Sequence, residues 1–261
     1  MTRQTILTTT LVLVISLATS ALQRASASII SSSDNFDSSH TYWNGSSTDV
    51  SGTIWTGVQG TGFANPIDAN VTNAGRLSIS QGSSASDGSN APFNVAALYR
   101  DVLGDFDARV EMPSLPADTS FLTLSLAAWS ADQANAVHID NIRGTTNRVR
   151  FRDLSAPDEF GLAIANPAWF RLEREGDAFT AYYGSDGINW TTIGTINRAY
   201  GDTLRVGLAA WDLNGNAFVA QFDNFQLDVV VVPEPSTALL LLVGLPLVEG
   251  VVRRQRRHNR K

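Results

Sequence analysis

Short apolar or alternating stretches recur along the middle of the chain, and glycine, asparagine, aspartate, serine or proline separates each from the next. None of them keeps a period of 3.6 residues for the length that a helix needs, whereas this alternation is typical of strands. The predicted strands are 76–79, 96–100, 106–112, 121–129, 136–142, 148–153, 169–175, 178–183, 190–193, 204–211 and 217–229. Many short strands joined by turns predict an all-β fold, an antiparallel β-sandwich or jelly roll.

Two turns between these strands have a clear signature. Glu175-Gly176-Asp177 separates two alternating runs and is predicted to close a hairpin. Ser185-Asp186-Gly187 is predicted to close the next one, with Trp190 opening the following strand. The segment 39–70 is rich in glycine and threonine and has little periodicity, so we expect it to wrap the sandwich rather than form a separate domain.

Residues 1–27 are typical of a secretory signal peptide. Arg3 supplies the positive start, 6–21 are largely apolar, and Ala25-Ser26-Ala27 fits a cleavage site. An N-terminal membrane anchor is the alternative, but threonines interrupt this short stretch, and a spanning helix needs about 20 apolar residues. We predict cleavage after Ala27, with a site nearer Ala21 as the alternative, which makes 28–228 the sandwich domain.

Residues 229–261 form a tail of three parts. A motif at 232–236 precedes an apolar, Leu/Val-rich span at 237–252 and a basic cluster at 253–261. Apolar residues partition into the bilayer, and the arginines stay on the cytoplasmic side. The tail therefore predicts a C-terminal transmembrane helix that holds the domain outside the inner membrane, and a plain membrane anchor is the simplest interpretation.

The order of these parts resembles the PEP-CTERM sorting signal. The residues that carry the resemblance are Pro233, Glu234, Pro235, Arg253, Arg254, Arg256 and Arg257. The span departs from the pattern because it is short and holds Pro246 and Glu249. The resemblance implies that an exosortase-type membrane enzyme cleaves the tail. It also implies a Gram-negative-type cell that makes exopolysaccharide, and delivery to the cell envelope surface or extracellular matrix.

The charge of the central segment limits its partners. Eight of the 19 basic residues and two of the 25 acidic residues lie outside 28–232, which leaves 11 arginines, 23 acids and a net charge of −12. Such a domain repels phosphate backbones, so we expect no nucleic-acid partner. The chain has no cysteine, which excludes disulfides, thiol catalysis and cysteine-ligated zinc.

A second resemblance runs through the central segment. It is carried in order by Gly104–Val110, Phe170–Gly176, Tyr182–Gly187 with Trp190, Val206–Leu208 and Phe222–Phe225. These segments are similar to a concanavalin A-like (laminin-G-like) jelly roll of the kind found in bacterial secreted and polysaccharide-associated proteins. The resemblance implies a fold rather than one function, because such a fold hosts many activities.

Catalytic residues are sparse. Glu173, Glu175 and Asp177 alternate and share one face of a predicted strand, but their order differs from the Glu-x-Asp-x-(x)-Glu of laminarinase-like enzymes. We interpret them as a solvated outer face and assign no catalytic pair. His138 alternates with apolar neighbours and is predicted to be structural, and no Gly-x-Ser-x-Gly elbow accompanies it. We therefore expect no enzymatic activity.

Two tryptophans are the ligand-binding candidates. Trp129 and Trp211 each end an apolar strand and run into a polar loop, with Asp212 and Asn214 following the second. Sugar C–H faces pack on such rings, and the alternative is that the rings fill the core. A basic stripe indicates either a groove for an acidic polymer or the wet face of a strand, and its members are Arg143, Arg148, Arg150 and Arg152.

Two carboxylates are candidate ligands for structural calcium. Asp34 opens the domain and Asp223 lies in its last strand, so the two carboxylates would converge if those strands pair. The alternative for both is turn chemistry, in which Asp and Asn side chains bond to nearby backbone.

Together these features predict an exported, exosortase-sorted protein with a non-catalytic, carbohydrate-associated jelly roll that contacts polysaccharide. A structural matrix protein without a specific ligand is the first alternative, and a glycan hydrolase or lyase is the second.

Overall fold

The computed structural model describes residues 28–60, 65–81, 93–113, 122–142, 148–154, 159–162, 167–212, 214 and 216–231. Contacts group Ile30–Val229 into one compact unit, and of a second unit only 28–29 and 230–231 are described. The predicted signal peptide and the tail from 232 onward lie outside the described residues. Within the described ranges, no helix is long and apolar enough to cross a membrane.

The described residues form an all-β fold. Its strands are β1 (Ser28–Asp34), β2 (His40–Trp43), β3 (Gly57–Gln59), β4 (Ile67–Ala69), β5 (Leu77–Gln81), β6 (Ala96–Leu103), β7 (Asp105–Glu111), β8 (Leu122–Trp129), β9 (Ala136–Ile142), β10 (Arg148–Asp153), β11 (Glu159–Leu162), β12 (Trp169–Glu175), β13 (Ala178–Gly184), β14 (Thr191–Asn197), β15 (Thr203–Asp212) and β16 (Phe218–Val231).

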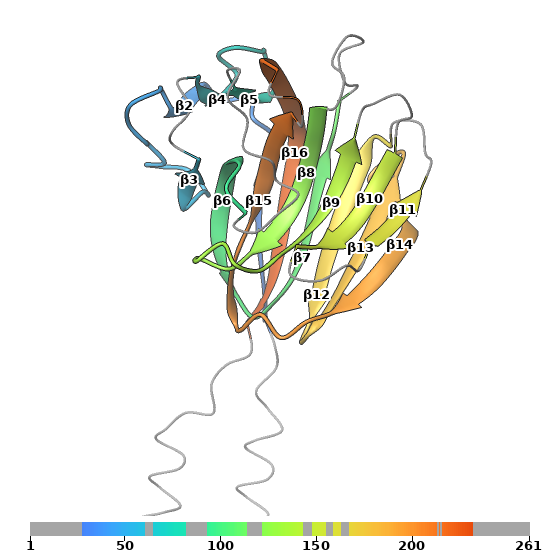
Figure 1. Ribbon diagram of the computed structural model, residues 1–261. Coiled ribbons are helices and arrows are strands. Elements are labelled where there is room, and N and C mark those ends of the chain that lie inside the picture. Colours follow the sequence, from blue (N-terminus) through green and yellow to red (C-terminus); the bar gives the residue numbers. More distant parts are fainter. Residues whose placement is uncertain are drawn as a thin grey trace, which may run out of the picture. The chain divides into compact units, whose positions relative to one another are not determined.

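These strands make two antiparallel sheets that face each other (Figure 1). One described sheet has the order β14-β13-β12-β7-β16-β5-β4-β2, with β1 also paired to β16. The other, seven-stranded among the described residues, has the order β11-β10-β9-β8-β15-β6-β3. The predicted antiparallel sandwich of jelly-roll type is thus confirmed as a fold class.

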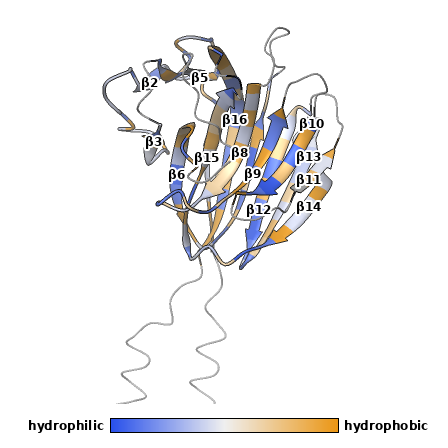
Figure 2. Cartoon of the chain, in the orientation of Figure 1, coloured by the Kyte–Doolittle hydropathy of each residue, from blue (hydrophilic) through white to orange (hydrophobic). Residues whose placement is uncertain are grey.

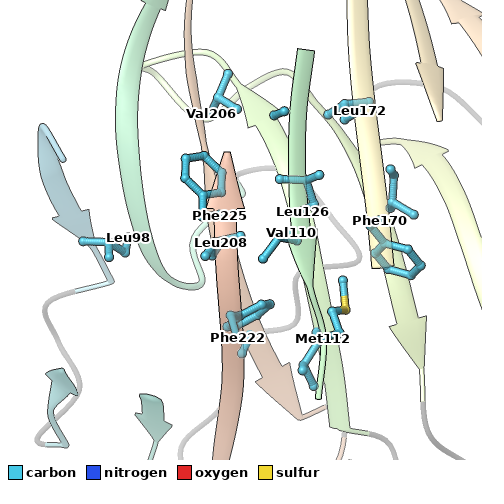
Figure 3. Close-up of a cluster of buried hydrophobic side chains, with 14 of the residues drawn as sticks. Leu98, Val110, Met112, Leu126, Phe170, Leu172, Val206, Leu208, Phe222 and Phe225 are labelled. Carbon is cyan, nitrogen blue, oxygen red and sulfur yellow. The ribbon is translucent and has the colours of Figure 1, made fainter. Parts of the chain in front are cut away.

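The main core lies between the two sheets because their strands alternate apolar and polar residues. On β12, Phe170 and Leu172 are buried, while Arg171 between them faces outward. Figure 2 shows such alternation as hydrophobic and hydrophilic segments along the strands. The buried chains of both sheets meet in the cluster drawn in Figure 3, which includes Leu126 and Phe222. Each large apolar side chain buried here contributes about 1.5–3 kcal/mol.

All of the predicted strands occur, and each overlaps an observed one. Both predicted turns also occur: Glu175 pairs with Ala178 across a two-residue loop in which Gly176 has φ 58°. In the second, the Asp186 carboxylate accepts hydrogen bonds from the backbone of Ile188 and Asn189. Alternation did not reveal the first four strands or β11, all of which are short or polar.

Candidate functional site

The outer face of the seven-stranded sheet holds a second apolar cluster, separate from the main core. On β8, Leu124 and Leu126 belong to the main core, whereas Ala127 and Trp129 belong to this second cluster. We call it the outer cluster, and its members are Phe93, Val95, Ala97, Ala127, Trp129, Ala136, Ala209 and Trp211. The outer face of an antiparallel sheet is commonly polar and wet, so buried apolar residues there mark a covered site.

Small residues form the middle of this face, and one aromatic ring lies among the larger side chains around it. The small residues, which pair across β6, β15 and β8, are Ala97, Ala127, Gly207 and Ala209. The ring of Phe93 has its centroid 5.2 Å from that of Trp129, 5.7 Å from His138 and 6.2 Å from Trp211. These three residues come from β8, β9 and β15, which are neighbours in the sheet (Figure 1).

The structure brings the two candidate tryptophans into this one cluster and buries both. Trp129 and Trp211 each have 0% of their surface exposed. Trp129 Nε1 donates a hydrogen bond of 2.8 Å to Gln59 Oε1, whereas Trp211 Nε1 has no partner among the described residues. Neither ring presents an open face to solvent, and a role in glycan binding stays a prediction.

A buried ionic group lies beside the aromatic rings. His138 and Asp140 are two residues apart on β9, so both point to the outer face, and Arg150 lies directly opposite Asp140 on β10. Asp140 accepts from His138 Nδ1 at 2.6 Å and from Arg150 Nη2 at 2.7 Å. Burial would raise the pKa of Asp140, but His138 and Arg150 together lower it below the ordinary value. Asp140 is therefore an ionised carboxylate with no exposed surface.

His138 and three buried side chains around it each leave a polar atom without a partner among the described residues. These atoms are Thr123 Oγ1, Ser125 Oγ, His138 Nε2 and Trp211 Nε1. Thr123 lies opposite Trp211, and Ser125 lies opposite Asp140, so the atoms belong to adjacent positions of three strands. In the tautomer whose Nδ1–H donates to Asp140, the unprotonated Nε2 is an acceptor. Buried polar groups are normally paired, so this concentration indicates a binding site.

Arginines surround the same face. Arg148 and Arg152 flank Arg150 at alternating positions of β10, and Arg152 lies opposite His138. On β15, Arg205 lies opposite Trp129, with its guanidinium 4.4 Å above the ring of Tyr99. Arg150 is paired with Asp140, and Arg205 lies 3.9 Å from Asp101, so carboxylates on the same face neutralise part of this positive charge.

The carboxylates Glu173 and Glu175 lie elsewhere, on the outer face of the nine-stranded sheet. Glu173 Oε1 is 3.2 Å from Arg171 Nη2, and its Oε2 accepts a 2.8 Å hydrogen bond from the Tyr182 hydroxyl. Burial and this hydrogen bond raise the pKa of Tyr182 to about 12. Glu175 is exposed and Asp177 lies in the hairpin turn, so the arrangement matches the solvated face that the sequence indicated.

The proposed calcium ligands have separate partners. Asp34 Oδ2 accepts from Trp55 Nε1 at 2.9 Å and from the Tyr42 hydroxyl at 3.2 Å. Asp223 forms an ion pair of 2.6 Å with Arg76. No group of three or more histidines and carboxylates in the described ranges is arranged to hold a metal ion. Calcium binding by Asp34 and Asp223 stays a prediction.

Asp212 and Asn214 lie in the turn that follows β15. Asp212 Oδ1 accepts from the backbone nitrogens of Asn214 at 2.8 Å and Asn216 at 3.1 Å. Asp212 follows Trp211 and pairs with the core residue Leu122, so its side chain leaves β15 on the opposite side from the outer cluster. The structure thus gives Asp212 a turn-capping contact and separates it from Trp211.

Sequence analysis missed the centre of this site. The alternation of His138 with Asp140 and of Arg150 with Arg152 was visible, and it places each pair on one face of a strand. What joins the two pairs is the register of β9 against β10, which no local pattern reveals. Alternation could not point to Phe93, because this residue lies outside the strands.

Comparison with known proteins identifies relatives of the fold. No protein-family model matches the chain, and no curated protein matches its sequence. Among solved structures, the GH43 protein BlXynB from Bacillus licheniformis has 16% identity and a TM-score of 0.54, covering 76% of this chain and 39% of that one. A bifunctional GH43-CE protein from Bacteroides eggerthii has 15% identity and a TM-score of 0.53, covering 75% of this chain and 25% of that one.

A third match is a protein of unknown function from Shewanella oneidensis, with 13% identity and a TM-score of 0.51. It covers 81% of this chain and 91% of that one. Identities this low establish a shared fold, and this chain spans less than half the length of each GH43 protein.

These comparisons correct two expectations. The sequence led us to expect a non-catalytic module and no enzymatic activity. The comparisons contradict both expectations. The solved structures that share the fold include GH43 glycoside hydrolases, which are glycan-active proteins.

Proposed function

We propose that this chain is an exported polysaccharide lyase that acts at the outer face of the seven-stranded sheet, with His138 as its base. One observation carries the proposal: Asp140 fixes the imidazole through Nδ1, and Nε2 has no partner among the described residues. A carboxylate in this position orients the ring and stabilises the imidazolium that forms when the ring takes a proton. The fold relatives supply the wider context of glycan chemistry.

The residues of this face favour elimination over hydrolysis. Hydrolysis of a glycosidic bond uses two carboxyl groups, one acting as an acid and the other as a base or nucleophile. The carboxylate beside His138 is Asp140, and both of its oxygens are already held by His138 and Arg150. Elimination needs one base and positive charge near the substrate's carboxylate, which His138 and the arginines of this face supply.

The proposed substrate is a polysaccharide that contains hexuronate. His138 Nε2 takes the proton from the carbon next to the sugar carboxylate. The electron pair of that C–H bond becomes a carbon–carbon double bond, the adjacent glycosidic C–O bond breaks, and the departing oxygen takes up a proton. Positive charge from the arginines of this face stabilises the negative charge that develops on the carboxylate, and no water is consumed.

We also propose a route to the place of action. The signal peptide exports the chain, the tail holds it briefly in the inner membrane, and an exosortase-type enzyme cleaves near Pro233–Pro235. The sequence order of motif, apolar span and arginine cluster supports this route. The released protein would act at the cell envelope surface or in the extracellular matrix, where polysaccharide is its partner.

Cleavage assays test the enzymatic proposal. The full chain, purified in detergent, is incubated with alginate, polygalacturonate, hyaluronan and a neutral glucan, and both new reducing ends and ultraviolet absorbance of the new double bond are followed. We expect both signals from at least one acidic polymer. His138→Gln is expected to lower the rate about 100-fold to 10,000-fold, the usual contribution of a general base.

The matched control is Glu173→Gln, which neutralises a carboxylate on the other sheet and is expected to leave the rate unchanged. Reducing ends without a double bond would show hydrolysis and contradict the elimination. No cleavage of any polymer by well-folded protein would contradict the proposed function.

A further inference from the structure

The Phe93 side chain occupies a cup in the outer face. The walls of the cup are the rings of Trp129, His138 and Trp211, and its floor is made of alanines of the same outer cluster. The ring of Phe93 has no exposed surface. The cup therefore has room for one six-membered ring, and in this structure the chain itself supplies that ring.

A phenyl ring fills the cup but does not satisfy its polar atoms. Thr123 Oγ1, Ser125 Oγ, His138 Nε2 and Trp211 Nε1 have no hydrogen-bond partner among the described residues, although all four side chains are buried. The set offers one donor, one acceptor and two hydroxyl groups that act as either. A ring that carries several hydroxyl groups could pair with these atoms, and phenylalanine cannot.

The attachment of Phe93 allows its side chain to leave. The residue lies outside the strands, before β6 begins at Ala96, so no sheet ladder depends on it. Its backbone nitrogen donates to Gln133 O at 2.9 Å, and its carbonyl accepts a hydrogen bond from Gln59 Nε2. Movement of Phe93 therefore breaks one loop contact and one contact with a side chain of β3, and it leaves the paired strands intact.

We propose that this cup is a subsite for one pyranose ring, and that Phe93 is its internal occupant when no ligand is bound. An incoming sugar displaces the phenyl ring, packs its apolar face on the surrounding aromatic rings, and pairs its hydroxyl groups with the four polar side chains. The proposal rests on the proposed function in one respect: it explains how a substrate reaches His138, which has no exposed surface.

Binding to full-length protein tests the subsite. Calorimetry is performed with five-sugar oligosaccharides of mannuronate, galacturonate and glucose, in a His138→Gln background that prevents turnover. Because the buried phenyl group no longer competes, Phe93→Ala is expected to bind at least one probe about tenfold to a hundredfold more tightly. Phe160→Ala removes a phenyl ring from the edge strand β11, outside the outer cluster, and is expected to leave the affinity unchanged.

Hydrogen exchange in the otherwise unaltered protein provides a second test, which holds even if Phe93→Ala fails to fold. The amide of Phe93 is bonded to Gln133, so displacement by a saturating probe is expected to speed its exchange. Slower exchange, or equal affinity of folded Phe93→Ala, would overturn the proposal. If the unaltered enzyme cleaves a polymer but neither the tighter binding nor the faster exchange is seen, only the role of Phe93 as internal occupant is rejected. Tighter binding without any cleavage supports the subsite and rejects the lyase.

Discussion

Asp140 is completely buried and negatively charged. Its two partners, Arg150 and His138, explain how a carboxylate can stay ionised there. Taking an isolated carboxylate out of water is so unfavourable that it normally becomes protonated instead. Here Arg150 supplies the compensating charge through Nε at 3.1 Å and Nη2 at 2.7 Å, and His138 supplies a further hydrogen bond. The pKa of Asp140 is lowered as a result, so the group is ionised throughout the neutral range.

Replacing Asp140 with asparagine tests this ion pair. The variant removes a buried carboxylate that neutralises Arg150, so we expect the free energy of unfolding at pH 7 to fall by about 3–5 kcal/mol. A carboxylate whose pKa is lowered by folding adds stability above its unfolded value of about 4 and loses it as pH falls further. The deficit of Asp140→Asn relative to the unaltered protein is therefore expected to shrink below about pH 4, as measured by urea unfolding.

Asp101→Asn is the control for that measurement. Asp101 is 48% exposed at its side chain and lies 3.9 Å from Arg205 Nε, which makes a surface ion pair of the same face. Such pairs contribute at most about 1 kcal/mol. An equal loss in the two variants would contradict a special role for the buried pair.

At the scale of elements, one glycine fixes how closely two central strands approach. A Cβ added at Gly207 on β15 would lie 2.2 Å from the backbone oxygen of Leu98 on β6. Backbone cannot move aside as the end of a flexible side chain can, so an alanine here must push the strands apart. Gly207 lies in the middle of the small-residue floor, and the close approach helps to form the cup above it.

The substitution Gly207→Ala is expected to lower the free energy of unfolding by about 1–3 kcal/mol or more, because the added methyl group strains the pairing of β15 with β6. Thermal unfolding followed by circular dichroism measures it. Gly161→Ala serves as the control, since β11 belongs to the same sheet and an added Cβ there meets nothing within 4 Å. Similar midpoints for the two variants would show that β15 and β6 separate without cost.

The sequence predicts some of these strands well and others poorly. Strands such as β7 and β12 alternate strictly, so their bounds and faces follow from period two. The three-residue strands β3 and β4 hold their places through neighbours, and their own residues give little alternation. Trp129 and Trp211 could be picked out singly, but their meeting at Phe93 depends on the register of β8 against β15.

At the scale of the whole molecule, charge is distributed unevenly. The segment 28–232 carries a net charge of −12, yet Arg148, Arg150, Arg152 and Arg205 all lie on the outer face of one sheet. Asp140 and Asp101 lie on the same face and pair with Arg150 and Arg205, so this face is less acidic than the rest of the segment but is not uniformly positive. The negative remainder keeps the protein soluble and discourages attachment to polyanions elsewhere on the molecule.

The predicted cleavage sites lie outside the described strands. Ala27 precedes Ser28, where the described residues of β1 begin, and Pro233–Pro235 follow Val231, where those of β16 end. Cleavage at both sites would therefore leave every described strand whole.

Intact-mass measurement of the mature protein, recovered from the envelope or medium of a cell that has an exosortase, tests this processing. We expect a chain that begins at Ser28 and ends near Pro233–Pro235, together with any group that the enzyme attaches. Replacing the tail arginines, for example Arg253→Ala and Arg254→Ala with Arg256→Ala and Arg257→Ala, is expected to leave uncleaved precursor, because the cytoplasmic anchor is lost. A mature chain that still carries residues up to Lys261 would instead mean that the tail is a permanent membrane anchor.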